Sequence, residues 1–132
     1  MTARFKDLCL DAGDHHALAD WWCTAFGYRR KDQLEPPTED DGSPWARPLD
    51  WPVPIVDPTA AGPLIWVIAV PEPKTVKNRI HPDFYGVTAE LLELGATVIR
   101  LAADAHDPDV EWDVLADPQG NEFCVFAPPA EL

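Results

Sequence analysis

The chain has 132 residues, of which 46% are hydrophobic and 25% are charged, and this composition is typical of one globular domain. A formal net charge of -13 at pH 7 excludes electrostatic attraction to nucleic acid or to an anionic membrane surface. The longest apolar run, Leu64 to Val70, has the length of a strand and not of a membrane span.

The cysteines and the first residues indicate an intracellular protein. Cys9, Cys23 and Cys124 are an odd number in no metal-ligand spacing, which favours reduced thiols. The N-terminal residues contain no apolar core of a signal peptide. We therefore expect a cytoplasmic protein that binds neither nucleic acid nor membrane.

The first half of the chain predicts a strand, a helix and a long loop. Phe5–Leu10 suits a strand, and Asp14 and Gly27 suit the N-cap and the left-handed end of a helix. A proline-rich loop is expected over residues 35–63, because ten of the fifteen prolines lie in residues 36–73.

Tryptophans within this loop argue against simple disorder. A solvated linker seldom carries tryptophan, and the loop contains Trp45 and Trp51. A loop of this length is usually a lid, a binding loop or disordered. Short strands fit near Val53–Val56 and Leu64–Val70, and the sequence leaves open whether the loop closes over a site.

The second half predicts a shorter helix followed by three strands. Apolar residues from Val87 to Leu94 form one helical face, and Gly95 ends it. Strands are expected at residues 97–101, 111–116 and 122–126. The turn Asp117-Pro118-Gln119-Gly120 joins the last two strands as a hairpin.

The two halves repeat one pattern of strand, helix and strands. Ala25-Phe26-Gly27-Tyr28 and Glu93-Leu94-Gly95-Ala96 end a helix at equivalent places of two βαβββ units. We therefore predict an α+β fold, with one domain over residues 1–132 that consists of module one, 1–72, and module two, 73–132. The two modules are expected to form a curved mixed sheet around a central cleft.

Four segments together carry a resemblance to a known family: Asp14–Tyr28, Val70–His81, Leu92–Thr97 and Asp117–Val125. In combination they resemble the glyoxalase-like domains of the vicinal-oxygen-chelate superfamily, which includes glyoxalases, bleomycin-resistance proteins and dioxygenases. The resemblance implies a small-molecule ligand and a homodimer. It also implies a divalent metal held by four side chains, one each from the first and last strands of both modules.

By this resemblance His81 falls on the third metal-ligand position and Asp7 on the first. Cys124 falls on the fourth, where the family commonly has glutamate, and the strand around Trp66 to Ile68 offers no ligand for the second. Imidazole with carboxylates suits manganese, iron, nickel or zinc. The sequence thus identifies no cofactor and leaves a divalent metal open.

Each of these residues also has a plainer interpretation. His81 is either a metal ligand or a histidine that hydrogen-bonds locally. Cys124 is a reactive thiol if His81 lowers its pKa, and otherwise a buried inert one. Glu122 is a candidate general base, and the ordinary alternative is an outward-facing charge beside a turn. Asp7 is otherwise a solvated residue near the N-terminus.

Six tryptophans exceed what packing of one domain requires, and they favour a cleft for a small hydrophobic or aromatic ligand. The predicted cleft residues are Asp7, Trp66, Arg79, His81, Trp112, Glu122 and Cys124.

Three functional hypotheses follow from these residues. The first, which the missing metal ligands and the tryptophans favour, is a small-molecule-binding protein with a degenerate metal site. The second is a metal-dependent lyase, isomerase or dioxygenase. The third is an interaction or regulatory module without catalysis.

Overall fold

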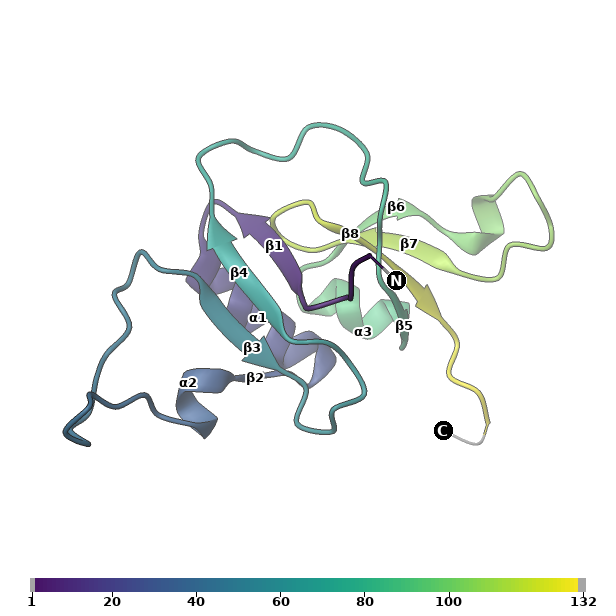
Figure 1. Ribbon diagram of the computed structural model, residues 1–132. Coiled ribbons are helices and arrows are strands. Elements are labelled where there is room, and N and C mark those ends of the chain that lie inside the picture. The colour runs from purple at the N-terminus through teal and green to yellow at the C-terminus, as the bar shows by residue number, and fades with distance from the viewer. Residues whose placement is uncertain (1, 131–132) are drawn as a thin grey trace. The chain divides into compact units, whose positions relative to one another are not determined.

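The same order of strands and helices occurs twice along the chain (Figure 1). The computed structural model describes residues 2–130 and divides into two units, one that ends at Pro73 and one that begins at Lys74. Each unit contains one four-stranded sheet in which the first and last strands are parallel and the other pairs antiparallel. The predicted α+β fold is confirmed, whereas the single domain, the module boundary and the central cleft stay predictions.

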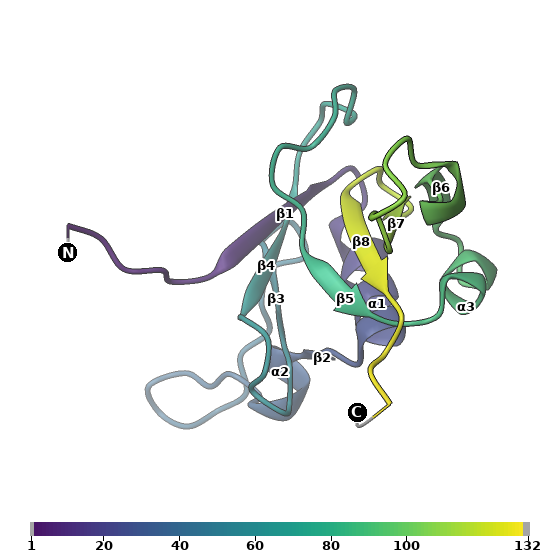
Figure 2. The same cartoon turned by 90° about the vertical axis from the view of Figure 1, so that its right-hand side faces the viewer.

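The first unit forms a sheet of strand order β1-β4-β3-β2. Its elements are β1 (Leu8–Ala12), α1 (His15–Phe26), β2 (Arg29–Arg30), α2 (Lys31–Leu34), β3 (Val53–Val56) and β4 (Ile65–Ala69). Figure 2 shows β1 running beside β4 within this unit. The strands predicted near Val53–Val56 and Leu64–Val70 are therefore confirmed as β3 and β4.

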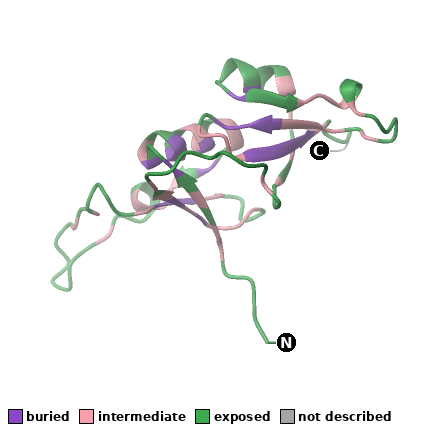
Figure 3. Ribbon diagram, turned by 90° about the horizontal axis from the view of Figure 1, so that it is seen from above, coloured by how far each residue is buried: buried purple, intermediate pink, exposed green. Residues whose placement is uncertain are grey.

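Helix α1 contributes large buried side chains to the core of the first unit. The Asp14 carboxylate accepts a hydrogen bond from the Ala17 N–H at 3.0 Å, and Gly27 ends the helix at φ 72°, as predicted. Leu18 and Trp22 of α1 are fully buried, and the helix packs against β3 and β4. Figure 3 colours buried residues purple. In residues 2–130, no helix is long and apolar enough to span a membrane.

The first strand is displaced from its predicted position. The sequence predicts Phe5–Leu10, whereas β1 is Leu8–Ala12, and Phe5 is 73% exposed. The reason is tertiary, because the parallel partner β4 sets the register, with Leu8 opposite Ile65 and Ala12 opposite Ala69. Phe5 favours a strand by its residue type, but it lies before Leu8, where the pairing of β1 with β4 begins.

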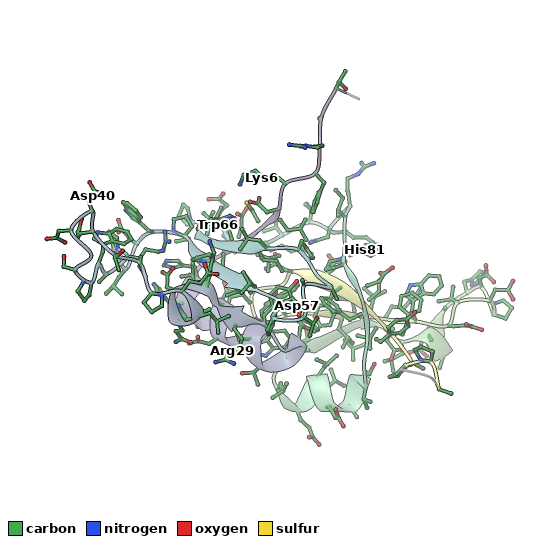
Figure 4. All side chains as sticks on the ribbon, turned by 60° about the horizontal axis from the view of Figure 1, so that its bottom comes forward. Lys6, Arg29, Asp40, Asp57, Trp66 and His81 are labelled. Atoms are coloured by element: carbon green, nitrogen blue, oxygen red, sulfur yellow. The ribbon has the colours of Figure 1, made fainter. Side chains whose placement is uncertain are left out.

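The proline-rich loop is attached to helix α1 by two histidines. His15 Nε2 donates to the Trp51 carbonyl at 3.0 Å, and His16 Nε2 donates to the Leu49 carbonyl at 2.8 Å. His15 is buried, although it lies in the first turn of the helix. Asp40, which Figure 4 labels, lies in the outer part of this loop, away from α1. No spacing rule predicts these tethers, because each joins residues more than 30 positions apart.

The second unit forms a sheet of order β5-β8-β7-β6. Its elements are β5 (Asp83–Tyr85), α3 (Thr88–Glu93), β6 (Thr97–Arg100), the 3₁₀ helix η1 (Ala102–Asp104), β7 (Asp113–Ala116) and β8 (Glu122–Phe126). The predicted second helix and the hairpin of β7 and β8 are confirmed.

The two faces of the second sheet differ in chemistry, because successive side chains of a strand point to opposite faces. Phe123 and Val125 lie on the apolar face, where Phe123 contacts Phe84 edge to face at 6.0 Å. Glu122, Cys124 and Phe126 lie on the opposite face, which we call the Cys124 face. Asp83 is paired with Cys124 and so belongs to the Cys124 face.

Candidate functional site

The turn before β8 fixes where the functional side chains of that strand begin. The Asp117 carboxylate accepts hydrogen bonds from the N–H groups of Gln119 and Asn121 at 2.9 and 3.0 Å. Gly120 has φ 89°, a left-handed conformation that favours glycine, and the Lys74 side chain packs beside it. The turn thus brings the 74–78 segment against the start of β8.

Glu122 is buried and bound by this segment. Its carboxylate accepts hydrogen bonds from Lys74 Nζ, from Lys77 Nζ at 3.3 Å and from the Asn78 N–H at 2.9 Å. Burial tends to raise the pKa of Glu122, but the hydrogen bonds from these three groups outweigh it and leave the pKa below its ordinary value. Glu122 is therefore an ionised anchor with its oxygens occupied, an arrangement that does not favour the role of general base.

His81, Asp83 and Cys124 come together on the Cys124 face. The Cys124 N–H donates to the Pro82 carbonyl at 2.9 Å and so sets the register between β8 and the segment that carries His81. Cys124 Sγ and His81 Nδ1 share a hydrogen bond at 3.3 Å, and His81 Nδ1 lies 3.8 Å from Asp83 Oδ1. The three potential ligand atoms lie within 4.8 Å of one another.

The thiol of Cys124 is held in its protonated form. Burial and then the neighbouring Asp83 carboxylate raise the pKa of Cys124 to about 11, although Arg100 and Lys77 act in the opposite direction. The alternative in which His81 activates the thiol is therefore not favoured by this environment.

Aromatic side chains and an arginine also belong to the Cys124 face, since Phe126 lies on it and Arg100 is paired with Val114, the partner of Cys124. The Trp112 ring stacks on the Phe126 ring with centroids 5.4 Å apart, and the Arg100 guanidinium lies 5.9 Å from the Trp112 centroid. Arg100 also donates to the Trp112 carbonyl at 2.9 Å. Its Nε is buried and has no hydrogen-bond partner within residues 2–130. Arg79, also predicted as a cleft residue, is exposed.

The two predicted site residues of the first unit bind each other. Asp7 accepts a hydrogen bond from Trp66 Nε1 at 3.1 Å and pairs with Lys6 Nζ at 2.6 Å, and Figure 4 labels Lys6 and Trp66 in this unit. The bond from Lys6 is the main cause of the lowered pKa of Asp7. The Arg47 guanidinium lies 5.6 Å from the Trp66 ring centroid. Asp7 is therefore an ionised carboxylate that already has two partners.

Within the second unit, sequence reasoning identified His81 and Cys124 but missed Asp83 and Arg100. Asp83 had a usable signal, because it lies two residues after His81 and period-two spacing places side chains on one face of an extended segment. Arg100 had none, since its position beside Trp112 depends on a register shift in the pairing of β6 with β7.

The potential ligand atoms fit a divalent cation of borderline softness. One imidazole nitrogen, one carboxylate oxygen and one sulfur are the ligand types that zinc accepts, whereas manganese prefers oxygen. Because Cys124 is buried and His81 and Asp83 are exposed, a bound cation would be reached from the side of His81 and Asp83.

Comparison with known proteins identifies the family and the fold. A family model described as a glyoxalase-like domain matches residues 7–126. No curated protein matches the chain.

Among solved structures, the fosfomycin resistance protein FosX from Mesorhizobium loti is similar to this chain with TM-score 0.60 at 12% identity, covering 99% of this chain and 96% of that one. A FosX mutant from Listeria monocytogenes, complexed with Mn(II) and 1S,2S-dihydroxypropylphosphonic acid, gives TM-score 0.62 at 14% identity, covering 99% and 96%. A glyoxalase/bleomycin resistance protein/dioxygenase family enzyme from Burkholderia phytofirmans PsJN gives 0.55 at 16%, covering 89% and 93%. At these identities the likeness concerns the fold alone.

Proposed function

The chain belongs to the glyoxalase-like domain family, and on that premise we propose that it binds a small molecule on the Cys124 face of its second sheet. The observation that carries this proposal is the combination of groups there. His81, Asp83 and Cys124 supply polar atoms, and the Trp112–Phe126 stack supplies a planar apolar surface. Ligand sites commonly combine apolar walls with a few convergent polar groups.

The surroundings of this face favour a ligand that has a planar apolar part and a hydrogen-bond acceptor. Aromatic rings bind planar groups by stacking, and Trp112 already stacks with Phe126. Arg100 places a positive charge next to Trp112, which favours an acceptor or anionic group on the ligand.

Other predicted cleft residues support the proposal less directly. Glu122 is occupied by Lys74, Lys77 and Asn78, so its role is to hold the 74–78 segment in place. Asp7 and Trp66 are bonded to each other in the first unit. The homodimer and the cytoplasmic location stay predictions.

The proposal is tested with a planar aromatic anion, anilinonaphthalene sulfonate, whose fluorescence rises when it binds an apolar surface. We expect Trp112→Ala and His81→Ala each to weaken its binding to metal-free protein by about tenfold, since each removes one recognition element. Trp45→Ala, which alters a half-buried tryptophan of the proline-rich loop, is the matched control and should leave the affinity unchanged. Unchanged affinity in both test variants would contradict the proposed site.

A second candidate function is metal-dependent catalysis by a lyase, isomerase or dioxygenase mechanism. The His81, Asp83 and Cys124 cluster favours it, and the FosX mutant that resembles this chain was complexed with Mn(II). The discriminating measurement is the metal content of protein purified without a metal-affinity tag, compared with the His81→Ala variant. Near-stoichiometric metal that disappears in the variant would favour catalysis over simple binding.

A further inference from the structure

We propose that His81, Asp83 and Cys124 form a three-ligand site for a thiophilic divalent cation of the zinc class, built by the second unit alone and poorly suited to manganese. Asp83 is not among the ligands that the family resemblance assigns, and the cysteine changes the class of metal. The proposal concerns the cation and does not depend on the small-molecule ligand proposed above.

The distances between the ligand atoms suit a tetrahedral site. A tetrahedral cation with bonds of about 2.0 to 2.3 Å holds its ligand atoms about 3.3 to 3.8 Å apart. His81 Nδ1 lies 3.3 Å from Cys124 Sγ and 3.8 Å from Asp83 Oδ1, so two of the three edges already have this length. Each of the three residues offers a ligand atom within 4.8 Å of those of the other two, so closing the set to tetrahedral edges takes a shift of about 1 Å.

The Asp83 side chain has the freedom to make this adjustment. It is 58% exposed, so rotation about its side-chain bonds meets little resistance from packing. Cys124, in contrast, is buried and fixed in the β8 ladder between β5 and β7. The fixed thiol and the adjustable carboxylate on the paired residue of β5 form a site that closes around a cation without movement of the sheet.

The charges of the site match a divalent cation. With a neutral imidazole, the Asp83 carboxylate and a metal-bound Cys124 thiolate supply two negative charges. The nearby Lys74 and Lys77 are both paired with Glu122, which reduces their repulsion of a cation. The Arg100 guanidinium donates to the Trp112 carbonyl at 2.9 Å and lies 5.9 Å from the centroid of the Trp112 ring.

The burial of the ligands leaves one side of the cation open. Cys124 is 1% exposed, while the side chains of His81 and Asp83 are 37% and 58% exposed. Three protein ligands and an accessible fourth position are characteristic of zinc sites that bind an exchangeable molecule. Sulfur as a ligand favours zinc or cobalt over manganese, because manganese prefers oxygen ligands.

The test uses the full chain, freed of metal, with Cys9→Ser and Cys23→Ser so that Cys124 is the remaining thiol. Titration with Co²⁺ should produce a sulfur-to-cobalt charge-transfer band with the visible absorption of four-coordinate cobalt. Zn²⁺ should displace the cobalt stoichiometrically. Mn²⁺ should bind at least about 100-fold more weakly than Zn²⁺.

Variants then identify the ligands. Cys124→Ser should abolish the charge-transfer band, and Asp83→Asn should weaken Co²⁺ binding by at least about tenfold. Asp83 is exposed, so Asp83→Asn is expected to fold, which circular dichroism checks, and Asp104→Asn is the matched exposed control. A cobalt spectrum without the sulfur band, unchanged affinity in Asp83→Asn, or Mn²⁺ binding equal to that of Zn²⁺ would each overturn the proposal.

These outcomes are separate from those of the ligand test. Anilinonaphthalene sulfonate binding is measured on metal-free protein, so loss of cobalt binding leaves that result unaffected. Loss of anilinonaphthalene sulfonate binding in Trp112→Ala, in turn, is not expected to alter the cobalt spectrum, because Trp112 is not one of the three ligands.

Discussion

The two units share one topology, with strand order β1-β4-β3-β2 in the first and β5-β8-β7-β6 in the second, but their helices and exposed chemistry differ. Helix α1 has 12 residues, a side-chain N-cap and four buried residues. Helix α3 has six residues, no side-chain cap and one buried residue, Leu91. The same backbone pairing is therefore compatible with helices that differ greatly in length and in buried residues.

The parallel pairs of the two sheets also differ in the side chains that they place opposite each other. In the first unit Cys9 is paired with Trp66, whose indole donates to Asp7. In the second unit Asp83 is paired with Cys124, and His81 lies beside both. The shared topology therefore places a carboxylate–tryptophan pair in one unit and three potential metal ligands in the other.

The largest effect is expected from a buried leucine of α1, which should contribute more to stability than a buried leucine of α3. Leu18→Ala should lower the free energy of unfolding by about 3 to 4 kcal/mol, because Leu18 is 2% exposed and its loss leaves a cavity among other buried side chains. Leu91→Ala should cost about 2 kcal/mol, since its neighbours Leu92 and Leu94 are partly exposed and the site relaxes more easily. Urea denaturation measures both, and an equal or larger loss for Leu91→Ala would contradict the comparison.

The next effect concerns the anchoring carboxylate of the second unit. Glu122→Gln should lower the free energy of unfolding by about 2 kcal/mol at neutral pH, because it weakens the charge-assisted hydrogen bonds from Lys74 and Lys77. Glu111→Gln, at an exposed position, is the control.

The same substitution has a defined pH dependence. Since the folded-state pKa of Glu122 lies below its ordinary value of 4.5, its contribution to stability is present above that value and is lost as pH falls through the folded-state pKa. The stabilities of the variant and the parent should therefore converge in acid. A difference that is constant from neutral to acid pH would refute the anchoring role.

A third effect distinguishes the buried thiol of the second unit from the exposed thiol of the first. Cys124 should react with iodoacetamide at neutral pH at least about 100-fold more slowly than Cys9, because Cys124 is buried and its pKa is about 11. Peptide mapping by mass spectrometry gives the rate at each site. Comparable rates would restore the alternative of an activated thiol at Cys124.

The smallest effect concerns the helix caps. Asp14→Ala should cost about 1 kcal/mol, because it removes the acceptor for the Ala17 N–H. Val87 is the N-cap of α3, is 48% exposed and offers no side-chain acceptor, so Val87→Asp should stabilise the protein by about 0.5 to 1 kcal/mol. Thermal unfolding of the two variants measures both changes, and a destabilising Val87→Asp would show that its side chain is needed for packing.

Much of the fold was predictable because its signals are local. Asp14 and Gly27 mark the ends of α1, and the turn from Asp117 to Gly120 joins β7 to β8. The position of β1 was not predictable, because its parallel partner β4 sets the register from more than 50 residues away. The short elements β2 and α2 were also missed, since two to four residues carry too little periodic signal.

Some residues of the candidate site could likewise be predicted from the sequence, and others could not. The resemblance carried by Val70–His81 and Asp117–Val125 already points to His81 and Cys124. Strand pairing, which the sequence does not show, brings Asp83 to them, gives Asp7 and Glu122 other partners and places Arg100 beside Trp112. The physical reason is that caps and turns are set by neighbours in the chain, whereas hydrogen-bond partners and the pKa of a thiol depend on groups that strand pairing brings together.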